Sequence, residues 1–206
     1  MSGLIKIAAF ILALVVLVVL IISSLYFETS YYQGKTVVAL GDSLTFGVGA
    51  AADENYVSRL VQALNIKIFN EGVNGNTTEE ALNRIQTDVL AFHPDAVIIL
   101  LGGNDFLQQI PIEKTRDNLA KIIDILNENK IKIVLVGLHH QFLSNYEKMY
   151  EDLAREKHVA GYVPDILGGI YQHPDLMFND IHPNASGYKI MAERIKPVLL
   201  RVLIAR

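Results

Sequence analysis

The 206-residue sequence contains no cysteine and no tryptophan. The lack of cysteine excludes disulfide bonds, a thiol nucleophile, cysteine-ligated zinc sites and lipid attachment to an N-terminal cysteine. Histidine does not supply a metal site instead, because the one adjacent pair, His139 and His140, lacks the i, i+4 spacing of a helical zinc site. We therefore expect neither a metal ion nor a cofactor.

An excess of positive charge is also absent. Every charged residue except Lys6 lies from Glu28 onward, where 17 basic residues stand against 22 acidic ones. A phosphate-binding surface needs a basic patch, so this balance argues against nucleic acid as a partner. Internal repeats and low-complexity runs are missing too, and the residues after 27 fit one domain with a sizeable core.

One long apolar run is present, at the N-terminus. Residues 7–22 are uninterruptedly apolar, and with residues 23–27 they reach the length of about 20 residues that crosses a bilayer. Lys6 precedes this run and Glu28 follows it, which predicts a cytoplasmic N-terminus and an extracytoplasmic remainder. We expect residues 1–27 to form a transmembrane helix that anchors the chain in the cell membrane. The alternative is a cleaved signal peptide and a secreted protein, although no Ala-x-Ala site follows.

After this run, expected strands and helices alternate along the chain. The expected strands are 36–40, 66–69, 96–101, 131–136 and 161–163, and the expected helices are 55–64, 78–92, 112–129, 146–158 and 186–204. Such alternation predicts a mostly parallel sheet with helices on both faces, an α/β/α sandwich in three layers.

The first strand is followed at once by Gly41-Asp42-Ser43-Leu44. A serine in this position lies at the carboxyl end of the strand, where open α/β sheets place their reacting groups. The tripeptide Gly-Asp-Ser is weak evidence by itself, because most serines in loops are solvated turn residues. Three later segments supply what a nucleophilic serine needs.

These segments bring an anion-binding loop, an amide and a histidine. The loop 70–78 is rich in glycine and asparagine, and its backbone N–H groups suit an anion, a helix N-terminus, or both. Asn104 follows the most hydrophobic strand, where its amide can donate to an oxyanion. His182 precedes Pro-Asn before the last helix, and histidine is the usual proton acceptor for a serine hydroxyl.

Taken together, the four ordered segments resemble the SGNH hydrolases, also called the GDSL esterase and lipase family, especially small bacterial acyl-thioesterase/lysophospholipase and arylesterase-like members. The resemblance covers about Val37 to Tyr188 and implies a flavodoxin-like sandwich over residues 36–206, after a linker at 28–35. It also implies a set of site residues: Ser43 as the nucleophile, His182 as the base, and the oxyanion hole of Ser43, Gly75 and Asn104.

The sequence departs from this family in one place. The family's last block reads Asp-x-x-His, but Asn179 stands three residues before His182, and the nearest acid, Asp180, stands two before it. Residues three apart share a face of a helix or tight turn, and residues two apart do not. Three groups can therefore orient the imidazole: Asp180, the Asn179 side-chain carbonyl, or a backbone carbonyl. A carboxylate stabilises an imidazolium whereas an amide does not, and this favours Asp180.

The expected function is hydrolysis of carboxylic esters or thioesters, such as lysophospholipids or short-to-medium acyl esters, by a Ser-His(-Asp) site. A carbohydrate O-acetyl esterase and a catalytically impaired binding module are the alternatives. Gly47-Val48-Gly49-Ala50-Ala51-Ala52 also matches a dinucleotide fingerprint. It lies several residues beyond the strand, however, and leaves the serine, asparagine and histidine segments unexplained.

Overall fold

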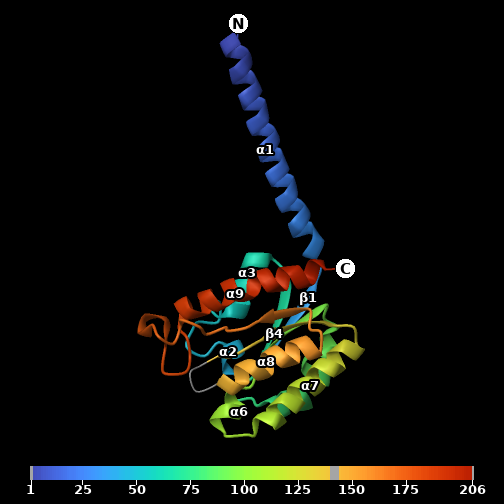
Figure 1. The fold of residues 1–206 in the computed structure, drawn as a ribbon, viewed down its shortest axis with the longest axis vertical. Helices are drawn as coiled ribbons and strands as arrows, with labels where there is room; N and C mark the ends of the chain where they lie inside the picture. Colours follow the sequence, from blue (N-terminus) through green and yellow to red (C-terminus); the bar gives the residue numbers. More distant parts are fainter. Residues whose placement is uncertain (1, 140–143, 206) are drawn as a thin grey trace. The chain divides into compact units, whose positions relative to one another are not determined.

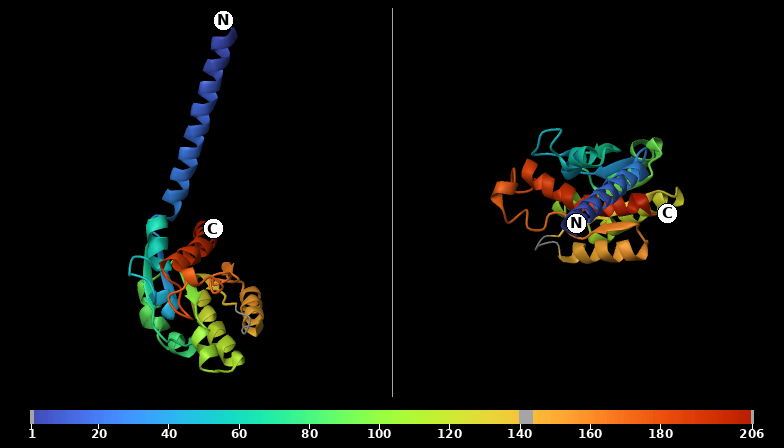
Figure 2. Two further views of the ribbon diagram at one scale, coloured as in Figure 1. Left: turned by 90° about the vertical axis from the view of Figure 1, so that its left-hand side faces the viewer. Right: turned by 90° about the horizontal axis from the view of Figure 1, so that it is seen from above.

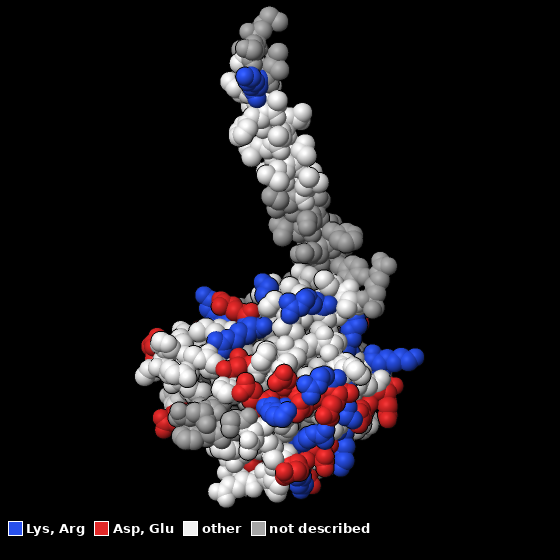
Figure 3. All heavy atoms as spheres, viewed as in Figure 1, with Lys and Arg blue, Asp and Glu red and all other residues white. Residues whose placement is uncertain are grey.

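The computed structural model describes the backbone of residues 2–139 and 144–205, without the side chains of 2, 4, 5, 21–31 and 144. The chain divides into two compact units, Met1–Gln33 and Gly34–Arg206. The first unit consists of helix α1 (Ser2–Tyr32). Lys6 is the only charged residue of α1 whose side chain is described (Figure 3).

Among the described residues, no helix combines the length and the apolar character that crossing a membrane requires. The side chains of residues 21–27, which the sequence includes in the expected span, lie outside the described ones. The membrane anchor therefore stays a prediction.

The second unit contains a five-stranded sheet in the order β2-β1-β3-β4-β5, and all neighbouring strands are parallel. Its strands are β1 (Thr36–Gly41), β2 (Lys67–Gly72), β3 (Ala96–Leu100), β4 (Lys132–Val136) and β5 (Gly161–Val163). This confirms the expected parallel α/β sheet. The strand order reverses between β1 and β3, which is the point where open α/β sheets form their binding crevice.

Helices cover both faces of this sheet. They are α2 (Ser43–Phe46), α3 (Tyr56–Leu64), α4 (Thr78–Asn83), α5 (Ile85–Asp88), α6 (Gly103–Leu107), α7 (Ile112–Glu128), α8 (Ser144–Glu156) and α9 (Ala185–Ile204), with 3₁₀ turns η1 (Leu90–Phe92) and η2 (Pro174–Leu176). Helices α3 and α9 pack together on one face, and α7 and α8 pack together on the other (Figures 1 and 2). The unit is therefore a three-layer sandwich.

The centre of the sheet aligns the ends of two strands. Val37 to Leu40 in β1 and all of β3 are fully buried, as expected for strands covered on both faces. Gly41 pairs with Leu100, so β1 and β3 end level with each other. The segments that follow these two strands consequently emerge side by side at one edge of the sheet.

The helix expected over 78–92 is broken into α4, α5 and η1. Arg84 lies at the first break, and its guanidinium donates to the carbonyl oxygens of Gly41 at 3.1 Å and Glu71 at 2.9 Å. These bonds tie the segment to the ends of β1 and β2. Such tertiary contacts override the helical preference of the local sequence.

Candidate active site

Ser43 is the first residue of α2, directly beyond the carboxyl end of β1. The Asp42 side chain caps this helix by accepting the N–H of Leu44 at 3.0 Å. The N–H of Ser43 belongs to the helix start, where no intrahelical acceptor exists. Ser43 itself is only 8% exposed, and it lines a cleft.

His182 comes from a tight turn between η2 and α9. The N–H of Phe178 donates to the carbonyl of His182 at 2.9 Å, and the N–H of Asn184 donates to Leu176 O at 2.8 Å. The Asn184 side chain then caps α9 by accepting the N–H groups of Ser186 and Gly187. The histidine is thus fixed between a closed turn and a capped helix.

The two residues meet across the sheet edge. His182 Nε2 lies 3.0 Å from Ser43 Oγ, which is hydrogen-bonding distance for a base and the hydroxyl it activates. On the other side of the ring, His182 Nδ1 lies 3.1 Å from Asn179 Oδ1. Burial lowers the pKa of the His182 imidazole. A lower pKa favours the neutral ring that can accept a proton.

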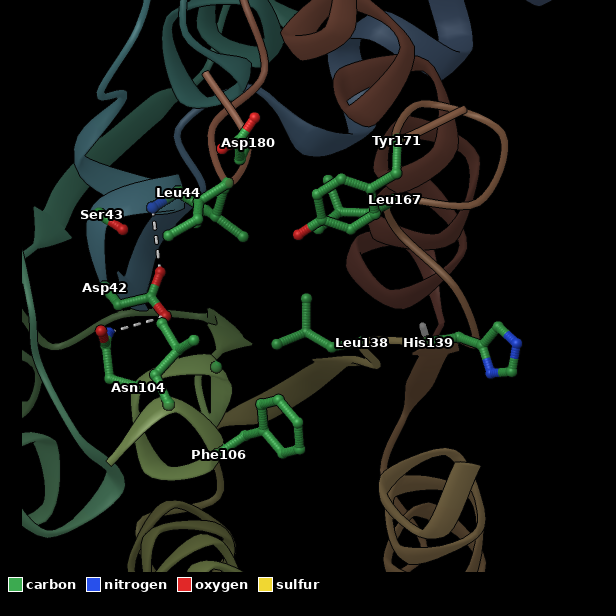
Figure 4. A pocket seen from close by; sticks show the side chains of 13 residues that line it. Asp42, Ser43, Leu44, Asn104, Phe106, Leu138, His139, Leu167, Tyr171 and Asp180 are labelled. Carbon is green, nitrogen blue, oxygen red and sulfur yellow. Dashed lines mark hydrogen bonds between the residues drawn. The ribbon is translucent and has the colours of Figure 1, made fainter. Parts of the chain in front are cut away.

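This arrangement differs from the expectation that Asp180 faces the imidazole. Asn179 and His182 are in contact across the turn, because the His182 N–H donates to Asn179 Oδ1. Asp180 lies between them in sequence and is exposed. The Asp180 carboxylate borders the cleft near Leu44 instead (Figure 4). In this structure the residue three before the histidine, Asn179, faces the imidazole, and the acid two before it does not.

Asn104 lies in α6, which starts after Gly102. Gly102 has φ +115°, and a Cβ there would meet the Tyr150 hydroxyl, so only glycine fits this turn. The Asn104 amide donates to Asn76 O at 3.1 Å and reaches Asp42 Oδ2 at 3.4 Å (Figure 4). The second contact is longer than an ordinary hydrogen bond. That N–H is therefore loosely held, and Asn104 lines the same cleft as Ser43.

Gly75 precedes Asn76 in the loop between β2 and α4, and it is exposed with φ +78°. The bond from Asn104 to Asn76 O links this loop to the segment after β3. The loop also opens α4, because Thr77 and Glu80 form a capping box. Both readings of the loop, a helix start and a source of backbone donors, are compatible with this geometry.

Asp42 is a residue to which the sequence assigned no role. It is 3% exposed, and burial raises the pKa of its carboxyl to about 7. Its two oxygens face Leu44 N and Asn104 Nδ2, so it joins the nucleophile segment to the amide. Its position inside the Gly-Asp-Ser tripeptide was the available signal, but its burial depends on packing by distant elements.

A cleft with a volume of about 190 Å³ opens beside Ser43. Its lining is mostly apolar: Leu44, Phe106, Leu107, Leu138, Leu167, Tyr171 and Ile181. His139 also borders it, while His140 lies outside the described residues. Apolar walls around a few polar groups are typical of a small-molecule site.

The glycines of the possible dinucleotide fingerprint have other roles. Gly47 ends α2 in a left-handed conformation, and a Cβ on Gly49 would lie 2.5 Å from Pro183 O. The close approach at Gly49 lets the turn that carries His182, here called the histidine turn, pack against the segment after α2. These glycines therefore do not open the helix that a bound pyrophosphate requires.

A profile of the GDSL-like lipase/acylhydrolase family matches residues 39–190. The chain belongs to this family. Its match spans the serine, glycine, asparagine and histidine segments, so the resemblance inferred from them is confirmed. Membership identifies the protein as a carboxylic ester hydrolase.

Individual members of the family are moderately similar. An arylesterase of Vibrio mimicus is 26% identical, over 82% of this chain and 90% of its own length. Thioesterase 1/protease 1/lysophospholipase L1 of Escherichia coli K12 is 25% identical, over 80% and 85%. The crystal structure of AlinE4, an SGNH-hydrolase family esterase, superposes with a TM-score of 0.64 at 30% identity, covering 83% of this chain and 97% of that one.

Proposed function

We propose that Ser43 attacks the carbonyl carbon of the substrate ester and that His182 accepts the hydroxyl proton. His182 then delivers that proton to the leaving alcohol or thiol. A water, deprotonated by the same imidazole, attacks the acyl carbonyl; the bond from the acyl group to Ser43 Oγ breaks, the proton passes to Oγ, and the carboxylic acid leaves. The N–H groups of Ser43 and Gly75 and the Asn104 amide would hold the oxyanion. The 3.0 Å contact between Ser43 Oγ and His182 Nε2 carries this proposal.

A fluorophosphonate probe tests the nucleophile. We expect the probe to label the wild type and Ser186→Ala, which changes an exposed serine at the start of α9, and to spare Ser43→Ala. Asn104→Ala should lower turnover by about 10² to 10³ if its amide is an oxyanion donor. Equal labelling of Ser43→Ala and wild type would exclude Ser43 as the nucleophile.

The substrates that we propose are esters or thioesters with short-to-medium acyl chains, lysophospholipids among them. The apolar cleft beside Ser43 supports this class, because an acyl chain gains free energy by leaving water for such walls. The names of the arylesterase and of the thioesterase/lysophospholipase agree with it.

A series of nitrophenyl esters of increasing chain length tests the substrate class. We expect kcat/KM to rise from acetate towards medium chains, and replacement of Leu138 in the cleft wall by Asp should abolish that rise. Activity confined to acetate would instead favour a carbohydrate O-acetyl esterase.

We also infer that residues 1–27 anchor the enzyme in the cell membrane with its hydrolase domain outside. The apolar run 7–22 and the position of Lys6 before it support this inference. Cleavage of the segment and secretion of the domain is the competing possibility.

A further inference from the structure

The Asn179 side chain has a fixed orientation in the histidine turn. Its Oδ1 accepts the backbone N–H of Ile181 at 2.9 Å and the backbone N–H of His182 at 2.8 Å. An amide nitrogen carries only donors, so it cannot face two N–H groups. The oxygen, and not the NH₂ group, must therefore be the atom that points to the His182 ring.

That orientation determines the tautomer of the histidine. An oxygen 3.1 Å from His182 Nδ1 requires a proton on Nδ1, because two acceptors facing each other form no hydrogen bond. In the neutral ring Nε2 is then unprotonated. Nε2 is also the atom 3.0 Å from Ser43 Oγ, so the ring is ready to accept the serine proton.

We propose that Asn179 is a positioning residue that holds His182 in the tautomer that can act as a base. The site then works with an uncharged amide in the place of the aspartate of a Ser-His-Asp site. This proposal rests on the proposed function of Ser43 and His182. It also makes the enzyme competent despite the missing aspartate, and so argues against an impaired binding module.

A comparison with trypsin-like enzymes whose triad aspartate is replaced by asparagine explains why this chain can lack the aspartate. Replacing the aspartate of a trypsin-like triad by asparagine lowers turnover by about 10⁴, because the ring adopts the wrong tautomer. Here two backbone donors prevent the amide from turning its NH₂ group to the ring. The loss is then limited to the charge that would stabilise the imidazolium.

The lack of this charge has a measurable consequence. The neutral imidazole is the active base, so activity is lost as the pH falls through the pKa of His182. Without a carboxylate partner, that acid limb lies at lower pH. An opposite charge at hydrogen-bonding distance raises a histidine pKa by about 1 to 3 units. Asn179→Asp should therefore move the acid limb of kcat/KM upward by that amount.

The test uses the full chain in detergent and a water-soluble nitrophenyl ester. For Asn179→Asp we expect the shifted acid limb and a plateau kcat/KM within about tenfold of wild type, since the tautomer was already correct. Asn179→Ala should lower the plateau by about 10² or more, and the aspartate variant serves as its rescue. Asp175→Asn, an exposed acid in η2, is the control that leaves the profile unchanged.

Two results would overturn the proposal. A gain of about 10⁴ in Asn179→Asp would mean that the amide offers the wrong tautomer. A downward shift of the acid limb in Asp180→Asn, without loss in Asn179→Ala, would transfer the role to Asp180. The NMR resonance of the His182 Nδ1–H proton provides a readout independent of turnover. It should persist in Asn179→Asp and vanish in Asn179→Ala. This result is expected even if Ser43→Ala proved as active as wild type and the proposed function failed.

Discussion

Asp42, the residue before the proposed nucleophile, has a carboxyl pKa near neutral. Burial raises the pKa of its carboxyl from 3.8 to about 7, so the folded protein binds more protons there than the unfolded chain between these values. Stability contributed by this group is therefore present at low pH and falls as the pH rises through about 7. The wild type should therefore lose unfolding free energy between pH 5 and pH 8. We predict that this loss is about 2 kcal/mol smaller in Asp42→Asn.

Urea unfolding at the two pH values measures this difference. Asp53→Asn, an exposed acid nearby in sequence, is the matched control and should retain the wild-type pH dependence. Turnover of Asp42→Asn should also fall, because an amide that keeps its oxygen on Leu44 N would direct a donor at the Asn104 amide. An unchanged pH dependence in Asp42→Asn would show that the pKa of the Asp42 carboxyl is not raised in the folded protein.

The sequence could predict the placement of some site residues but not of others. The placement of Ser43, Asn104 and His182 at one edge of the sheet was predictable, because each follows a recognisable apolar run or precedes a helix and parallel topology gathers such segments there. The choice between Asn179 and Asp180 was not, because it depends on a turn closed by the Phe178 N–H and the His182 carbonyl. That bond has no signature in residue types.

Helix α4 is held to its neighbours by one buried carboxylate from α6. Asp105 is fully buried and accepts Thr78 N at 2.9 Å, the Thr78 hydroxyl, and Thr115 Oγ1 at 3.2 Å. We predict that Asp105→Ala lowers the unfolding free energy by about 3 kcal/mol, because these donors lose their partner away from water. Asp117→Ala, an exposed acid on α7, should change it by less than about 0.5 kcal/mol. Equal urea midpoints for the two variants would contradict this role.

The five strands and the long helices α7 and α9 were predictable from apolar runs and turn residues. The short helices α2 and α6 were not, because helices of four or five residues carry no periodic pattern and are stable only through caps and packing. Both short helices follow the central strands and carry site residues. The parts of the fold that escape pattern reasoning are thus the parts that position the chemistry.

The candidate site and the N-terminal helix belong to different units of the chain. The sheet, the cleft and all the candidate site residues belong to Gly34–Arg206, and no side chain of α1 that the structure describes is among them. We therefore predict that deletion of residues 1–27, the expected anchor, leaves kcat/KM on a water-soluble nitrophenyl ester within about twofold of the full chain, because no group that reacts or lines the cleft is removed.

Cell fractionation of the same two proteins tests the proposed anchor. An apolar run of about 20 residues holds a protein in the bilayer, so the full chain should sediment with membranes and resist extraction by salt, whereas the deleted form should not sediment. External protease should digest the hydrolase domain of the full chain in spheroplasts, because Lys6 directs the N-terminus inward. A mature protein that begins near Leu25 and accumulates in the medium would identify the run as a signal peptide. Protection of the domain from protease would instead reverse the proposed orientation.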